Sequence, residues 1–133
     1  IVHNLAQART ALAAACQCNR PIMLQSPEST SAATGPAIFV ETTKLAKESY
    51  PEAFAGAIFD CGIEAGIAIA AIRTGDCDII VSTEPETTEK IKKLAEARGV
   101  TAFDKRAPED RGSAVLDLKD AKSVSPVVRS AIT

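Results

Sequence analysis

Aromatic side chains and histidine are scarce in this sequence. Only 4% of the 133 residues are aromatic and none is tryptophan, so a buried core has to be built from aliphatic side chains. His3 is the only histidine, which excludes a conventional histidine-rich zinc site. A Ser-His-Asp triad would depend on this one residue close to the beginning of the sequence. We therefore expect no metal and no other cofactor.

An excess of charge of one sign and a long hydrophobic run are also absent. The formal net charge is -2, which gives no electrostatic footprint for nucleic acid. No apolar run approaches the roughly 18 residues of a membrane span. We expect partners that are neither nucleic acids nor membranes. Since 46% of the residues are hydrophobic, a disordered chain is excluded as well.

The cysteines show no disulfide framework. None of the four forms a C-x-x-C pair, and a domain of this size does not need disulfides to fold. Residues 4–16 lack the continuous apolar run of a signal peptide. We therefore expect a cytoplasmic protein with reduced thiols. The cysteines concerned are Cys16, Cys18, Cys61 and Cys77.

Hydrophobic strand patterns alternate with helical patterns along the chain. Strands are predicted at residues 21–26, 55–61, 78–82, 100–104 and 114–118, and helices at 4–16, 36–50, 63–72, 84–98 and 126–132. Strands that are apolar throughout and separated by helices indicate a parallel sheet. We predict one α/β domain over residues 1–133, with a mostly parallel sheet of four or five strands and helices on both faces. The arrangement is either half-barrel-like or a flavodoxin-like three-layer sandwich.

The helical patterns also predict which side chains point inward. Residues 63–72 are apolar on nearly every side, which is typical of a helix buried all round. Thr83 and Glu86 have the spacing of a capping box, and Gly75 is placed to end the preceding helix in a left-handed conformation. The inward residues expected on the second and fourth helices are Ile38, Leu45 and Ala46, and Thr87, Ile91, Leu94 and Ala95.

Polar residues follow the predicted strands. Because ligands bind beyond the carboxyl ends of parallel strands, these residues predict a site for a small anionic metabolite. The alternative is that they are only loop and cap residues, and both interpretations remain open. The candidate ligand-binding residues are Gln25, Ser26, Asp60, Cys61, Ser82 and Lys105.

Asp60 and Cys61 form the most informative pair among these candidates. An acid at the end of a hydrophobic strand is partly desolvated, which suits a general acid or base, so Asp60 is the candidate catalytic residue. Cys61 precedes a helix, which lowers the pKa of a thiol and makes it reactive. The alternative is an Asp60 that caps the helix near Ile63, beside a small buried cysteine.

Five short segments carry a resemblance to a known family: Asn4-Leu5, residues 21–25, Asp60-Cys61-Gly62, residues 71–75 and residues 79–82. Together they resemble the first half of class II, zinc-dependent fructose- and tagatose-bisphosphate aldolases. The family motif His-x-Asp-His-Gly corresponds to residues 58–62, which keep the aspartate and glycine and replace both histidines. The resemblance implies a β/α-barrel-like arrangement with Asp60 at the position of the catalytic acid. Zinc-dependent aldolase activity is not implied, because the ligands are missing and 133 residues are too few for eight βα units.

The leading functional interpretation is a non-catalytic binding or assembly protein with an anionic-metabolite site at the strand ends. An incomplete barrel leaves sheet edges and apolar helix faces to be covered. With the apolar segments 63–72 and 127–132, this predicts a homodimer. The alternative is a metal-free lyase or isomerase that uses Asp60 as its acid and base, assisted by Lys105 or Cys61.

Overall fold

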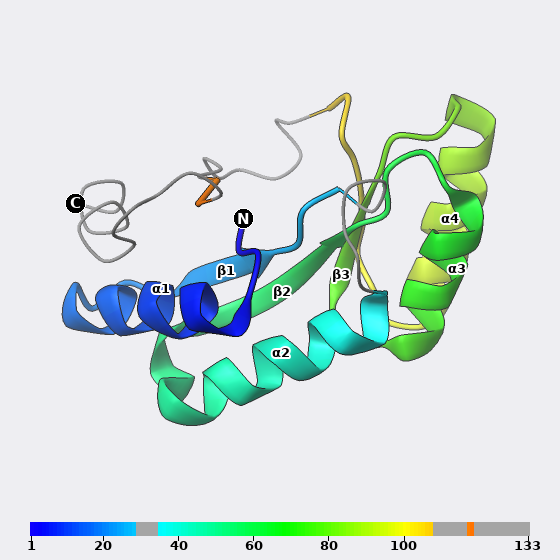
Figure 1. Ribbon diagram of the computed structural model, residues 1–133. Helices are drawn as coiled ribbons and strands as arrows, with labels where there is room; N and C mark the ends of the chain where they lie inside the picture. The colour runs from blue at the N-terminus through cyan, green and yellow to red at the C-terminus, as the bar shows by residue number, and fades with distance from the viewer. Residues whose placement is uncertain (29–34, 108–116, 119–133) are drawn as a thin grey trace.

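A four-stranded parallel sheet flanked by four α-helices forms the protein in the computed structural model, which describes residues 1–28, 35–107 and 117–118 (Figure 1). The predicted α/β class with a parallel sheet is confirmed. In chain order the elements are α1 (Leu5–Gln17), β1 (Ile22–Gln25), α2 (Pro36–Ser49), the short 3-10 helix η1 (Pro51–Ala53), β2 (Phe54–Asp60), α3 (Ala65–Thr74), β3 (Asp78–Val81), α4 (Pro85–Ala97) and β4 (Ala102–Asp104).

The strands lie in the sheet in the same order as in the chain, β1-β2-β3-β4. Right-handed connections between such neighbours place α2, α3 and α4 on one face, and each helix packs against the next, beginning with α1 on α2. This succession is that of a half-barrel, whereas a flavodoxin-like sheet exchanges its first two strands. The described helices cover this one face of the sheet. The predicted last helix at 126–132 and residues 114–116 of the predicted fifth strand lie outside the described residues.

The core lies between the helices and this face of the sheet. Leu24, Phe59, Ile79 and Val81 point into it from three adjacent strands. Phe39 of α2 packs on Phe59, with ring centroids 5.7 Å apart. The remaining volume is filled by small side chains, because α1 and α3 contribute mainly buried alanines. As expected from the scarcity of aromatics, the core is aliphatic around one pair of phenylalanines.

The predicted inward faces of two helices are partly wrong. In α2, Ile38 is 58% exposed and Leu45 is also exposed. Thr43 is buried instead, because its hydroxyl donates a hydrogen bond to the Val40 carbonyl (2.8 Å) and its methyl group packs inward. In α4, Leu94 is exposed and Thr88 is buried. The inward residues are Pro36, Phe39, Val40, Thr43 and Ala46 on α2, and Thr88, Ile91 and Ala95 on α4.

α3 begins two residues later than predicted and is not buried all round. Ala68, Ala71 and Ile72 are buried, but Ile69 is exposed. The prediction was wrong because a helix at the surface of one sheet layer buries only one stripe, whatever the composition of the other side. Gly75 ends α3 with φ of 69°, as predicted.

The predicted capping box at the start of α4 is also wrong. Glu84 is the N-cap residue, and no side chain caps this helix by a hydrogen bond. The Thr83 hydroxyl instead shares a hydrogen bond of 2.8 Å with the Thr88 hydroxyl. Within the described residues no helix is long and apolar enough to cross a membrane.

Candidate functional site

An ion pair joins the carboxyl ends of β2 and β4. Asp60 ends β2 and Lys105 follows β4, and the Lys105 ammonium lies 3.0 Å from Oδ2 of Asp60. Because β3 lies between these strands, the ion pair spans the central strand. The Asp60 side chain is 2% exposed and the Lys105 side chain is 44% exposed. The pair therefore joins a buried anion to a cation that is still in contact with solvent.

Asp60 is held by two further hydrogen bonds. Its Oδ1 accepts from the Gly62 backbone N–H (3.0 Å), and its own N–H donates to Oγ of Ser26 (2.8 Å). Ser26 Oγ donates in turn to the Pro27 carbonyl (2.9 Å), and the Ser26 N–H donates to the Ile58 carbonyl (2.9 Å). Both carboxylate oxygens of Asp60 thus have partners. Asp60 caps the turn at Gly62 and not α3, whose N-cap is Glu64.

Ser82 follows β3 directly and lies between the two ends of the ion pair. Its N–H donates to the Gly62 carbonyl (2.8 Å) beyond β2. On the other side Val81 is paired with Asp104 and accepts from the Lys105 N–H (2.9 Å), so Ser82 is level with Lys105. Ser82 Oγ is buried and has no hydrogen-bond partner in the described parts of the chain. No other described side-chain nitrogen or oxygen in a buried position lacks a partner.

Cys61 is a buried thiol with a raised pKa. Burial, together with the negative charge of Asp60, raises the pKa of Cys61 from 9.0 to about 12. The prediction of a lowered pKa was wrong because the residue lies inside the core and not at an exposed helix start. Its Sγ lies 3.7 Å from the Phe59 carbonyl oxygen. Of the two interpretations, the small buried cysteine is confirmed.

Gln25 ends β1 and is paired in register with Ile58 of β2. Its carbonyl accepts from the Val2 N–H (2.9 Å), and its side chain is buried. The structure therefore brings Ser26, Asp60 and Lys105 together, with Ser82 beside them. Gln25 lies on the flanking strand.

Thr88 belongs to the same end of the sheet and was not among the sequence candidates. It is buried, bonds to Thr83, and lies 3.5 Å from Nη2 of Arg106. Arg106 also contacts Asp104 through its Nε (3.2 Å) and Nη2 (3.4 Å). The helical periodicity of α4 could have identified Thr88 as a buried residue, because the helix turns Thr88 and not Leu94 toward the sheet.

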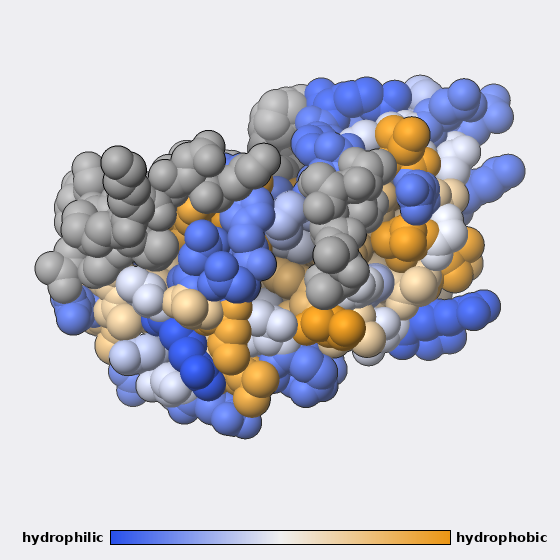
Figure 2. Space-filling view, in the orientation of Figure 1, coloured by the Kyte–Doolittle hydropathy of each residue, from blue (hydrophilic) through white to orange (hydrophobic). Residues whose placement is uncertain are grey.

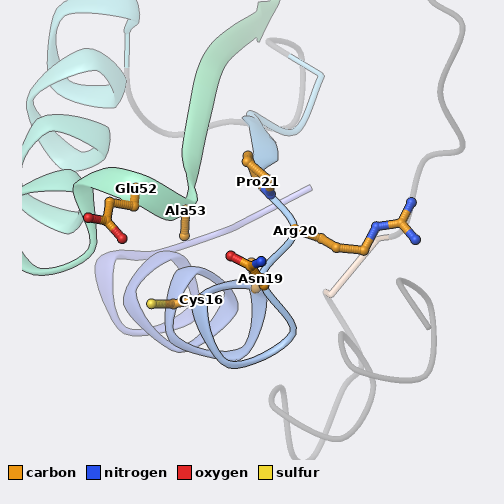
Figure 3. A pocket seen from close by; sticks show the side chains of 7 residues that line it. Cys16, Asn19, Arg20, Pro21, Glu52 and Ala53 are labelled. Atoms are coloured by element: carbon orange, nitrogen blue, oxygen red, sulfur yellow. The ribbon is translucent and has the colours of Figure 1, made fainter.

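A small hollow lies at the opposite end of the sheet, before β1 and β2 (Figure 3). In Figure 3 the Arg20 side chain points away from Cys16 and Glu52. The Arg20 guanidinium therefore lies away from the side of the hollow formed by Cys16 and Glu52. Its lining residues are Ala15, Cys16, Asn19, Arg20, Pro21, Glu52 and Ala53.

The fold and the ion pair define an α/β protein with a parallel sheet and a charged, hydrogen-bonded cluster at its carboxyl edge. Comparison with known proteins adds no closer assignment: no protein-family model, no curated protein and no solved structure matches the chain. Within the described residues, no group of three or more His, Cys, Asp or Glu side chains could hold a metal ion.

Proposed function

We propose that this protein is a non-catalytic binding protein that holds a small anionic metabolite at the carboxyl edge of its sheet. The observation that carries the proposal is the half-exposed Lys105 ammonium, which is fixed in place by the buried Asp60 carboxylate. An ammonium has three N–H donors, and the ion pair with Asp60 uses one of them. The remaining donors can bind an oxyanion from solvent.

Because Lys105 is held in position, we expect it to bind a ligand more tightly than a free surface lysine would. A long flexible side chain loses rotamer freedom when it binds a ligand, and a lysine already held at 3.0 Å from Asp60 has lost part of it before binding. Asp60 also lowers the local positive charge. The ligand must therefore be held by directed hydrogen bonds as well as by charge.

A thermal-shift screen with sugar phosphates and small carboxylates tests this function. A ligand at 100 times its Kd stabilises a protein by about 2.7 kcal/mol. Lys105→Gln should remove the stabilisation, whereas Lys93→Gln on the exposed face of α4 should keep it. No stabilisation of the wild type by any ligand at millimolar concentration would contradict the proposal.

The alternative function is a metal-free lyase or isomerase with Asp60 as acid and base. The observation in its favour is that Asp60 and Lys105 are within reach of one small substrate. Against it, the Asp60 side chain is only 2% exposed and both of its oxygens already accept hydrogen bonds, which leaves little access for a substrate. Asp60→Asn tests it: a change in stability without a change in ligand binding or turnover would reject the enzyme.

A homodimer in the cytoplasm is part of the proposal. Ile63 is 67% exposed beside α3, and Ile69 of α3 and Ile38 of α2 are exposed as well. Figure 2 shows separate hydrophobic areas divided by hydrophilic ones on the face of the molecule that it presents. The apolar segment 127–132 lies outside the described residues. Light scattering of the wild type and of Ile63→Asp tests the dimer, because a buried charge at the interface should yield monomers.

A relation to class II aldolases is also proposed. One support is the Asp60-Cys61-Gly62 segment. The other is the sheet, whose strands follow one another in chain order, as such a relation would require.

A further inference from the structure

We propose that Ser82 is the second anchor of the ligand, and that the ligand is an oxyanion whose oxygens contact the Ser82 hydroxyl and the Lys105 ammonium together. This inference rests on the proposed function and adds the residue that would select for an acceptor oxygen.

Ser82 Oγ is buried and has no hydrogen-bond partner among the described residues, although the residue as a whole is only half-buried. Leaving a buried hydroxyl unpaired destabilises a protein, so native structures contain few such groups. A group of this kind at the edge of a proposed site is explained when the ligand supplies its partner.

The position of Ser82 supports this explanation. Its backbone is tied to Gly62 beyond β2, and the neighbouring Val81 carbonyl is tied to Lys105 beyond β4. Asp60, Ile80 and Phe103 are in register one layer below, and alternation along the strands places Ser82 and Lys105 on the same face as these residues. The Lys105 side chain crosses β3 at this level to reach Asp60. A ligand on Lys105 is therefore adjacent to Ser82, and the buried Ser82 hydroxyl meets it by a rotation about χ1, for which the partial exposure of the residue leaves room.

The ligand class follows from the donors. Lys105 can only donate, and a serine hydroxyl can donate to an anionic oxygen while it accepts from a ligand hydroxyl. Hydrogen bonds to charged groups are the stronger ones. A phosphate or carboxylate accepts from both donors, whereas a neutral or cationic compound offers Lys105 no charged acceptor beyond Asp60.

Two measurements on the full chain test the role of Ser82. The first is an NMR titration with inorganic phosphate and with malonate at constant ionic strength, with the backbone amides of Gly62, Ser82 and Lys105 as reporters. Ser82→Ala should weaken binding about tenfold, the effect of one charged hydrogen bond. Ser49→Ala, a serine exposed at the end of α2, should leave the Kd unchanged.

The second measurement is the Tm of the ligand-free variants. Removing an unpaired buried hydroxyl should raise the Tm of Ser82→Ala by a few degrees or leave it unchanged, while binding is weakened. This combination separates a ligand contact from a structural hydrogen bond. A lowered Tm of Ser82→Ala would show that the hydroxyl has a structural partner and would overturn the inference.

The outcomes distinguish this inference from the proposed function. If the wild type binds phosphate or malonate and Lys105→Gln abolishes binding while Ser82→Ala keeps it, the role of Ser82 is rejected and the binding function stands. If neither anion shifts the three reporter amides of the wild type, both the function and the inference fail.

Discussion

Lys105 and Asp60 lie 3.0 Å apart and join the ends of β4 and β2 across β3. β4 has only three residues and pairs with β3 alone in the described sheet. The ion pair therefore adds a side-chain connection where the backbone pairing is shortest. The ion pair also compensates the negative charge of Asp60, whose carboxylate is almost fully buried at this edge of the described sheet.

Removal of the cation should destabilise the protein. Lys105→Met leaves the Asp60 carboxylate buried with only the Gly62 N–H on its side chain. Breaking a buried ion pair costs about 3–5 kcal/mol, and an exposed one at most about 1 kcal/mol. Since one partner is buried and the other half-exposed, we expect a loss of about 2 kcal/mol in urea unfolding. Lys93→Met is the control, and equal stability of the two variants would show that the ion pair contributes nothing.

Ser26 should matter through the backbone of Asp60. Ser26→Ala removes the acceptor of the Asp60 N–H, which lies in a buried environment. A buried donor left without a partner costs about 1–3 kcal/mol. We expect a loss in this range by chemical denaturation. Ser49→Ala, at an exposed position, should stay within about 0.5 kcal/mol of the wild type.

Stability should fall in alkaline solution because of the two buried thiols. Burial raises the pKa of Cys61 to about 12 and that of Cys77 to about 11, from 9.0. As the pH rises above 9.0, the unfolded chain releases these protons while the folded chain retains them. Stability is thus highest below pH 9.0 and decreases above it by about 1.4 kcal/mol per pH unit for each such thiol.

The alkaline loss can be separated from lysine and tyrosine titration by difference. Cys61→Ala should show a shallower decrease than the wild type between pH 9 and pH 11, measured by urea unfolding at each pH. A parallel experiment with a thiol reagent at pH 8 should label the exposed Cys16 rapidly and Cys61 only after unfolding. Identical pH profiles of the two proteins would contradict the assigned cause.

The rotation of α2 about its own axis can be tested with two variants at adjacent residues. Phe39→Ala removes a ring packed on Phe59 and should cost about 3 kcal/mol. Ile38→Ala changes a side chain that is 58% exposed and should cost less than about 1 kcal/mol. Thermal unfolding of both variants is sufficient. A larger loss for Ile38 than for Phe39 would mean that α2 is rotated, or that Ile38 is covered by a partner chain.

Local sequence patterns predicted the helices and strands well and the buried faces less well. Short apolar runs bounded by Pro and Gly identify β2 and β3 regardless of their neighbours. The inward side of α2 was misassigned because Thr43 satisfies its hydroxyl within the helix and can be buried like an apolar residue. Hydropathy alone ranks Ile38 and Leu45 above Thr43, although the helix turns them to the surface.

Part of the candidate site was also readable from the sequence. Polar residues after apolar strands pointed to Ser26, Asp60, Ser82 and Lys105, because parallel strands end at a common edge. Cys61 alternates to the core side of the sheet, and no local rule separated it from Asp60. The partners of Asp60 were not predictable. Ser26 and Lys105 lie 34 and 45 residues away along the chain.

The sequence by itself determined an aliphatic α/β chain whose strands end in polar residues, since composition and hydrophobic period are local properties. Only the tertiary structure decided that β2 and β4 flank β3, and so that Lys105 reaches Asp60 over Ser82. Ion pairing, burial and an unpaired hydroxyl depend on distances between segments far apart in the chain. These distances are set by the packing of the whole sheet against its helices.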